Sequence, residues 1–304
     1  MSKNPIGDEG IADISQALKY SLSVVYIDLS SINLGPKGGS HLLKGLAVNE
    51  SITHLNIASH KGLYRNKLGA KGLKKIVPVL RNNKVLAIIN ITGNAIRAEG
   101  LAYIAEGIVG NSTLTSLRIG HNEIQGNGVI KSIKTILLDS KLKELDLSDN
   151  PLKSLCIEEI SNILGNNASV LQRLYCSGID INCKILINLL ASSVRKAFAG
   201  ISKSLQVIKF DRNDFSGSEF IEHVSLLVGT GSYLHHISLN ECWLGERGGN
   251  TLFKAIQGNR YIQSISLQKN NLENVTAKAF GEALYSSMKV QMVNLSQNNI
   301  SVSF

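Results

Sequence analysis

One spacing of apolar residues constrains the fold of this chain more than any other feature. It is clearest in Leu142–Leu152, where leucines stand at the first, fourth, sixth and eleventh positions and Asn150 stands at the ninth. The same template begins at nine other places: Val24, Ile52, Leu86, Leu114, Leu171, Leu205, Leu234, Ile262 and Val290. Self-similarity at a period of about 28 residues is typical of a repeat protein, in which each unit completes its core only against its neighbours.

Each unit predicts a short strand, a turn and an amphipathic helix. In Leu117–Ile119 the alternation of side chains places two apolar residues on one face, as in a half-buried strand. The segment Gly100–Ile108 has its apolar residues at helical spacing. Glycines recur where these helices begin, for example Gly72 and Gly128, and we expect them to let neighbouring helices approach closely.

The ninth template position predicts how the loops are held together. In six units this position is an asparagine: Asn94, Asn122, Asn150, Asn213, Asn270 and Asn298. A buried amide there can bond the backbone of its own loop and of the next one. Ile32, Ile179 and Cys242 replace it in three units, and we expect them to keep the space filled but to lose those bonds.

A strand–helix unit of 28 or 29 residues resembles the ribonuclease-inhibitor-like class of leucine-rich repeats. The resemblance covers essentially the whole chain. It implies an α/β solenoid of about ten to eleven repeats shaped as a horseshoe, with parallel strands on the concave face and α-helices on the convex face. We expect a single domain, 1–304. Because no separate polar cap is visible at either end, we favour a fragment of a longer protein over end-to-end pairing or a cap formed by Met1–Leu18.

Two units are 34 residues long and depart from the rhythm. The first contains an insertion at His60–Arg65, for which a role in interaction and tolerated drift are equally supported. The second is lengthened between Asn182 and Ser204, where a longer helix without functional meaning is the favoured interpretation.

Composition and motifs narrow the classes of function. The chain has no apolar run long enough to predict a transmembrane helix and no apolar core of a signal peptide, so we expect a cytoplasmic protein with reduced cysteines. Catalytic motifs such as a P-loop, G-x-S-x-G or H-E-x-x-H are missing, and the cysteines lack metal-ligand spacing. We therefore expect no enzyme, no cofactor, no metal and no small-molecule substrate.

The formal net charge of +9 is compatible with a nucleic acid, an acidic protein or a membrane surface as partner, but a soluble basic surface is the favoured interpretation. The basic residues are scattered over the predicted helices without interleaved aromatic side chains, so nucleic-acid binding is not expected.

The candidate partner-binding surface is the middle of the predicted concave face. Charged and aromatic side chains gather there and at the strand ends: Arg118, Glu144, Asp146, Arg173, Tyr175, Lys209, Asp211, Arg212 and Trp243. A mixed-charge centre containing tyrosine and arginine is typical of a protein-binding hot spot. The alternative is a solvated sheet face whose opposite charges satisfy one another across strands. For Trp243, an exposed anchor and a ring packed over its own loop are equally supported.

Two finer resemblances give alternative functions. Asn4–Gly10 is similar to the first repeat of Ran GTPase-activating proteins, but the arginine that follows in that family has no counterpart in Gly10–Asp13. Ser204–Phe215 followed by Leu234–Leu244 is similar to the later repeats of CARMIL-type actin-regulatory proteins, which implies a cytoskeletal scaffold module. The favoured hypothesis is a non-enzymatic scaffold that binds a protein partner through the concave face.

Overall fold

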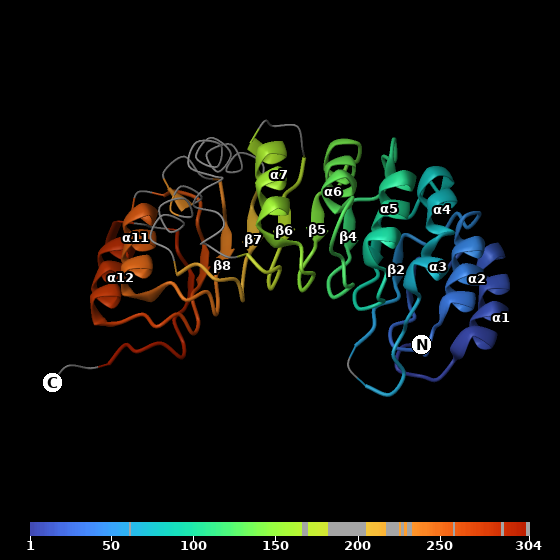
Figure 1. Cartoon of the computed structure of the whole chain (residues 1–304), viewed down its shortest axis with the longest axis horizontal. Coiled ribbons are helices and arrows are strands. Elements are labelled where there is room, and N and C mark those ends of the chain that lie inside the picture. Colours follow the sequence, from blue (N-terminus) through green and yellow to red (C-terminus); the bar gives the residue numbers. More distant parts are fainter. Residues whose placement is uncertain are drawn as a thin grey trace. The chain divides into compact units, whose positions relative to one another are not determined.

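The computed structural model describes residues 1–60, 62–165, 170–181, 205–216, 225, 228–229, 233–257, 259–286 and 289–301. They belong to two compact units, Met1–Pro151 (unit 1) and Leu152–Phe304 (unit 2). Both units consist of the same strand–loop–helix repeat (Figure 1). The lengthened segment between Asn182 and Ser204 is entirely outside the described residues, as is Lys61 of the insertion.

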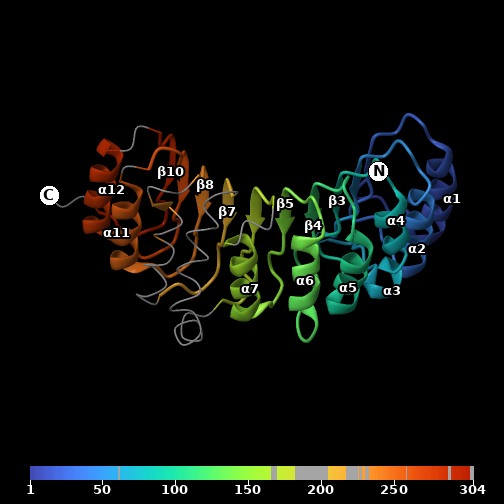
Figure 2. The ribbon, with the colours of Figure 1, turned by 90° about the horizontal axis from the view of Figure 1, so that it is seen from above.

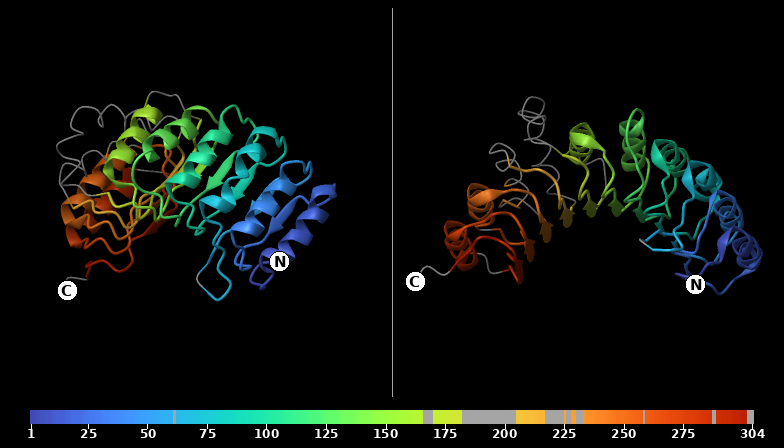
Figure 3. Two further views of the ribbon diagram at one scale, coloured as in Figure 1. Left: turned by 45° about the vertical axis from the view of Figure 1, so that its right-hand side comes forward. Right: turned by 60° about the horizontal axis from the view of Figure 1, so that its bottom comes forward.

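Unit 1 contains five parallel strands that pair in chain order. They are β1 (Tyr26–Asp28), β2 (His54–Asn56), β3 (Ile88–Asn90), β4 (Ser116–Arg118) and β5 (Glu144–Asp146). The helices of unit 1 are α1 (Gly7–Tyr20), α2 (Pro36–Leu46), α3 (Gly69–Leu73), α4 (Ile76–Asn82), α5 (Arg97–Ile108) and α6 (Val129–Leu138). They lie on one side of the sheet and leave its other side, the open face, uncovered (Figures 2 and 3).

Unit 2 repeats this arrangement. Its described helices are α7 (Lys153–Gly165), α11 (Gly245–Ile256) and α12 (Asn274–Ser286). Its parallel strands are β6 (Arg173–Tyr175), β7 (Val207–Lys209), β8 (His236–Ser238), β9 (Ser264–Ser266) and β10 (Met292–Asn294). Equivalent template positions face each other across every pair, as Tyr175 and Lys209 do. The predicted α/β architecture of parallel strands and helices is confirmed.

The core follows the template. Leu114, Leu117, Ile119 and Ile124 occupy the first, fourth, sixth and eleventh positions of one unit, and all four are buried. The strand itself has only three residues, and burial of these apolar side chains against the adjacent units stabilises the repeat.

The ninth position ties neighbouring loops together as predicted, but the second loop is the preceding one and not the next one. The Asn122 side chain is fully buried, and its Nδ2 donates to the carbonyl oxygens of Ile91, Ile119 and Gly120, each at 3.0 Å. Its Oδ1 accepts the backbone N–H of Asn94 at 2.8 Å. The amide thus satisfies groups of its own loop and of the loop before it.

Cys242 corrects one detail of that prediction. Its thiol Sγ lies 3.3 Å from the carbonyl oxygens of both Phe210 and Asn240 and can donate its one proton to either of them, where Asn270 uses its Nδ2 on the equivalent carbonyls of Leu239 and Gln268. Because a thiol can donate one hydrogen bond, the replacement keeps part of the donor function. What it lacks is the amide oxygen.

The insertion leaves the template intact. Asn66 resumes it after the inserted residues and is buried. Its Oδ1 accepts the N–H groups of Ile32 and Leu34, each at 2.9 Å. The repeat therefore resumes at Asn66, directly after the insertion.

The glycines have two different roles. A Cβ on Gly72 of α3 would lie 2.9 Å from Cα of Pro36 at the start of α2, so the predicted close approach of helices is confirmed there. Gly128 instead has a φ of +86° and nothing within 4 Å of its would-be Cβ, so backbone conformation explains this glycine.

Candidate functional site

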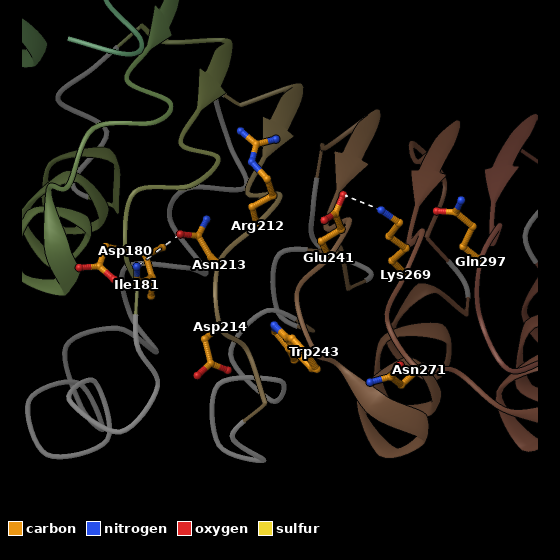
Figure 4. A pocket seen from close by; sticks show the side chains of 10 residues that line it. All are labelled: Asp180, Ile181, Arg212, Asn213, Asp214, Glu241, Trp243, Lys269, Asn271 and Gln297. Atoms are coloured by element: carbon orange, nitrogen blue, oxygen red, sulfur yellow. Dashed lines mark hydrogen bonds and ion pairs between the residues drawn. The ribbon is translucent and has the colours of Figure 1, made fainter. Parts of the chain in front are cut away.

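The loops that follow the strands of unit 2 line an open pocket of about 580 Å³. Most of its residues come from the eighth and tenth template positions, on either side of the buried ninth residue. Figure 4 shows the lining side chains: Asp180, Ile181, Arg212, Asn213, Asp214, Glu241, Trp243, Lys269, Asn271 and Gln297. The pocket therefore lies along one edge of the repeats, beyond the ends of the strands.

An unusual backbone conformation presents these side chains. Arg212, Glu241 and Trp243 have φ values of +55°, +57° and +58°, in the left-handed region that residues with a Cβ seldom adopt. The same conformation occurs in unit 1 at His121 and Glu123, so it belongs to the repeat. The hydrogen bonds of the ninth residue hold the chain there, and the flanking side chains point away from the core.

Trp243 is the most prominent side chain of the pocket, with 64% of its surface exposed. Its neighbours Cys242 and Leu244 are buried, and their N–H groups both donate to Oδ1 of Asn270, at 2.9 and 3.3 Å. The backbone is thus fixed on both sides of the indole. A large aromatic surface held this rigidly loses little conformational entropy when a partner covers it.

The pocket carries charges of both signs. Glu241 Oε1 and Lys269 Nζ lie 3.6 Å apart in an exposed ion pair. Asp214 Oδ1 accepts the backbone N–H of Ser216 at 3.1 Å, and Asp180 and Arg212 are exposed. Three carboxylates and two cations surround the indole of Trp243. The pocket can therefore pair with positively or negatively charged side chains of a ligand that covers the indole.

The open face of β6 and β7 adds a second group. Lys209 Nζ lies 5.5 Å from the centre of the Tyr175 ring, a cation–π contact across the strand pair. Arg173 lies half-buried on β6, opposite Val207. Asp211 has a structural role, because its Oδ1 accepts Ser238 Oγ at 2.6 Å and the N–H of Asn240 at 2.8 Å.

His236 lies half-buried on β8, the next strand of that face. Burial lowers the pKa of its imidazole below the ordinary value of 6.5, and the neighbouring His235 and Lys209 lower this pKa further. The imidazole is therefore neutral at pH 7 and adds no positive charge to the surface.

The three predicted residues of unit 1 form a different arrangement. Glu144 is only 4% exposed, although its strand position predicted an outward side chain. Its Oε1 accepts Arg118 Nε at 2.6 Å and Ser116 Oγ at 3.0 Å from the neighbouring strand. Asp146 is half-buried and its Oδ1 accepts the N–H of Ser148 at 2.9 Å. These contacts match the alternative interpretation, in which opposite charges pair across strands.

Eight of the ten residues that line the pocket were absent from the sequence-based prediction of the site, and four of them are charged: Asp180, Asp214, Glu241 and Lys269. The prediction followed the strand positions, whereas these residues share the eighth and tenth positions with Arg212 and Trp243. Comparing the eighth and tenth positions of all repeats would have identified them.

Within the described part of the chain, no group of three His, Cys, Asp or Glu side chains could hold a metal ion. No described helix is both long and apolar enough to cross a membrane.

Comparisons with known proteins match the fold. Two family models, both described as leucine-rich repeats, match residues 110–131 and 141–163. A search of curated proteins gave no significant match. The leucine-rich repeat-containing protein LegL7 from Legionella pneumophila is 17% identical with a TM-score of 0.55, covering 92% of this chain and 85% of that one. TLR13, in a complex with ssRNA13, is 15% identical with a TM-score of 0.52, covering 93% of this chain and 34% of that one. At such identities the likeness concerns the fold alone.

Proposed function

We propose that this chain, which is a leucine-rich repeat protein, is a non-enzymatic module that binds a protein partner through unit 2. The contact surface consists of the pocket around Trp243 and the adjoining open face with Tyr175 and Lys209. The observation that carries this proposal is the exposed indole of Trp243 on a backbone fixed from both sides. Tryptophan, tyrosine and arginine are enriched among the residues that dominate binding energy in protein interfaces.

The composition of this surface supports a protein ligand. An aromatic centre surrounded by charged and amide side chains resembles the apolar core and polar rim of protein interfaces. Solenoid proteins also commonly bind through the extended surfaces that their repeats expose. Arg118 and Glu144 of unit 1 pair across neighbouring strands, and Asp146 accepts from Ser148 in its own loop, so the proposed surface does not include these three residues.

The stretch that resembles Ran GTPase-activating proteins contributes to folding here. Oδ1 of Asp8 accepts the backbone N–H of Gly35, which precedes α2, at 2.6 Å. This contact gives Asp8, one of the two acidic residues of Asn4–Gly10, a role in the fold. Together with the missing arginine, it supports the interaction module over a GTPase activator.

The test compares two exposed aromatic residues of unit 2. Wild type, Trp243→Ala and Tyr285→Ala are used as baits in native lysates, and proteins lost only with Trp243→Ala are purified and titrated. Tyr285 on α12 is 96% exposed and lies outside the pocket, so its variant is the matched control. We expect Trp243→Ala to weaken binding by about 2 kcal/mol, roughly thirtyfold in Kd.

A charge reversal at Lys209 on the open face provides a second, independent test of the same proposal. Lys209→Glu removes the cation over Tyr175 and should weaken the same partner by roughly tenfold. The proposal fails if folded Trp243→Ala and Lys209→Glu both retain every partner at wild-type affinity. It also fails if Tyr285→Ala loses the same partners to the same extent.

A further inference from the structure

Unit 1 contains a second open pocket, of about 810 Å³, at the equivalent edge of its repeats. It lies where successive loops enter α2, α3 and α5, and it includes residues from 33 to 36, 65 to 71, 95 to 99 and 123 to 125. Its tenth-position residues include Lys67 and Glu123, whereas the pocket of unit 2 has Asp214 and Trp243 there. The two pockets thus share their place in the repeat and differ in their chemistry.

The charges of this second pocket are unbalanced. It is lined by four cations and two carboxylates. One carboxylate, Glu123, pairs with Arg97 at 3.0 Å, and the other, Glu99, accepts the hydroxyl of Tyr103 at 2.8 Å. The remaining cations are Arg65, Lys67 and Lys71. All three are exposed, and none forms an ion pair with any described residue.

The insertion at His60–Arg65 supplies part of this pocket. Its two ends are tied to the preceding loop, since His60 N–H donates to Ser31 Oγ at 2.8 Å and the carbonyl of Tyr64 accepts Asn33 N–H at 3.2 Å. Leu63, between these ties, is 90% exposed. Figure 3 shows the loop projecting from the adjoining elements of unit 1. The insertion therefore places the exposed apolar side chain of Leu63 two residues before Arg65, which lines the basic pocket.

We infer that this pocket and the inserted loop bind an acidic segment of a protein partner. Its Asp or Glu carboxylates pair with Arg65, Lys67 and Lys71, and an apolar side chain of the segment packs on Leu63. Charge complementarity gives the sign of the ligand, and Leu63 distinguishes a polypeptide from a small anion. A membrane is the weaker fit, because stable anchoring needs more apolar area than one leucine provides.

Fluorescence anisotropy on the full chain tests the proposal with a defined probe, a labelled peptide in which glutamates alternate with leucines. We expect Arg65→Glu/Lys67→Glu/Lys71→Glu to weaken its binding by at least roughly tenfold, and Leu63→Ser by roughly threefold. The matched control is Lys131→Glu/Lys134→Glu/Lys141→Glu, which changes the net charge equally at exposed lysines outside this pocket. It should bind the peptide nearly as wild type does.

Three results would overturn the proposal: no peptide binding by wild type at 50 mM NaCl, equal weakening by the two triple variants, or a Leu63→Ser variant that binds like wild type.

Inorganic phosphate and vesicles containing phosphatidylserine are added as competitors in a second series. Displacement of the peptide by either one at a matched concentration of negative charge would assign the cations to a phosphate ligand or a lipid surface instead. Lack of such displacement supports the acidic polypeptide. Trp243→Ala is included as well, because its normal binding of this peptide separates the site from that of unit 2.

Discussion

The buried asparagine position is occupied continuously in the later part of unit 1 and is interrupted in unit 2. Asn94, Asn122 and Asn150 follow one another in unit 1, and each amide donates into its own loop and accepts from the loop before. In unit 2, Cys242 stands between Asn213 and Asn270 and retains only the single donor of its thiol. The interruption lies directly before Trp243. The amide oxygen that Cys242 lacks would accept from the preceding loop, whereas the loop that presents Trp243 keeps its own tie to Asn270.

This comparison separates two kinds of position within one loop. The ninth residue satisfies backbone groups in the core, so its side chain can vary only at a cost in stability. The eighth and tenth residues point outward, and they range from Gly93 and Ala95 in unit 1 to Glu241 and Trp243 in unit 2. The fold thus depends on the first kind, and binding specificity can change through the second kind without altering the scaffold.

The largest expected effect is that of Asn122→Ala in the continuous row. It removes an amide donor to three carbonyl oxygens and an acceptor for the N–H of Asn94 in a fully buried site. We expect a loss of about 2–4 kcal/mol in the free energy of unfolding, measured by urea denaturation with circular dichroism. The control is Asn299→Ala at an exposed position, with an expected change within about 0.5 kcal/mol. Equal losses in the two variants would show that the buried amide has no special role.

Substitutions at the interruption should have smaller effects of opposite sign. Cys242→Ala loses the thiol contacts to Phe210 and Asn240 and some buried volume, which we expect to cost about 1–2 kcal/mol. Cys242→Asn restores the amide oxygen for the loop before it and should stabilise by about 0.5–1 kcal/mol. The same urea titration ranks the variants by their free energy of unfolding. If Cys242→Asn were less stable than Cys242→Ala, the loop would be shaped around the thiol and the comparison between the two rows would fail.

The burial of this thiol predicts its reactivity. Burial raises the pKa of Cys242 to about 12 and that of Cys156 on α7 to about 11, against 9.0 for an ordinary thiol. At pH 8 the thiolate fraction of Cys242 is therefore lower by roughly a thousandfold, and the thiolate is the reactive form. We expect iodoacetamide to label neither residue in the folded protein and both residues in urea, as mapped by peptide mass spectrometry. Equal labelling rates of Cys242 in both states would contradict its place in the core.

The amino-acid sequence was sufficient for the parts of the structure that depend on the five-position template. The spacing of Leu114, Leu117 and Ile119 gave the strand and its buried face, and Asn122 gave the tie between loops. The site was less predictable, because exposure depends on neighbouring strands. Glu144 has the template position of an outward residue, yet Arg118 and Ser116 enclose its carboxylate. Likewise, the left-handed backbone that exposes Trp243 needs no glycine, so no residue type marks it.

The smallest effect concerns pH and the open face of unit 2. The pKa of His236 is lowered in the folded protein, by burial first and then by His235 and Lys209, so the unfolded chain binds a proton more readily near pH 6.5. The stability associated with the neutral imidazole is present above that pH and is lost as the pH falls through the lower folded-state pKa. His236→Gln removes this titration, and we expect the variant to keep more of its pH 7.5 stability at pH 5.5 than wild type does. His41→Gln on exposed α2 surface is the control. Urea midpoints that fall equally with pH in wild type and His236→Gln would show that His236 is as well solvated as His41, and that the cation of Lys209 does not influence it across the sheet face.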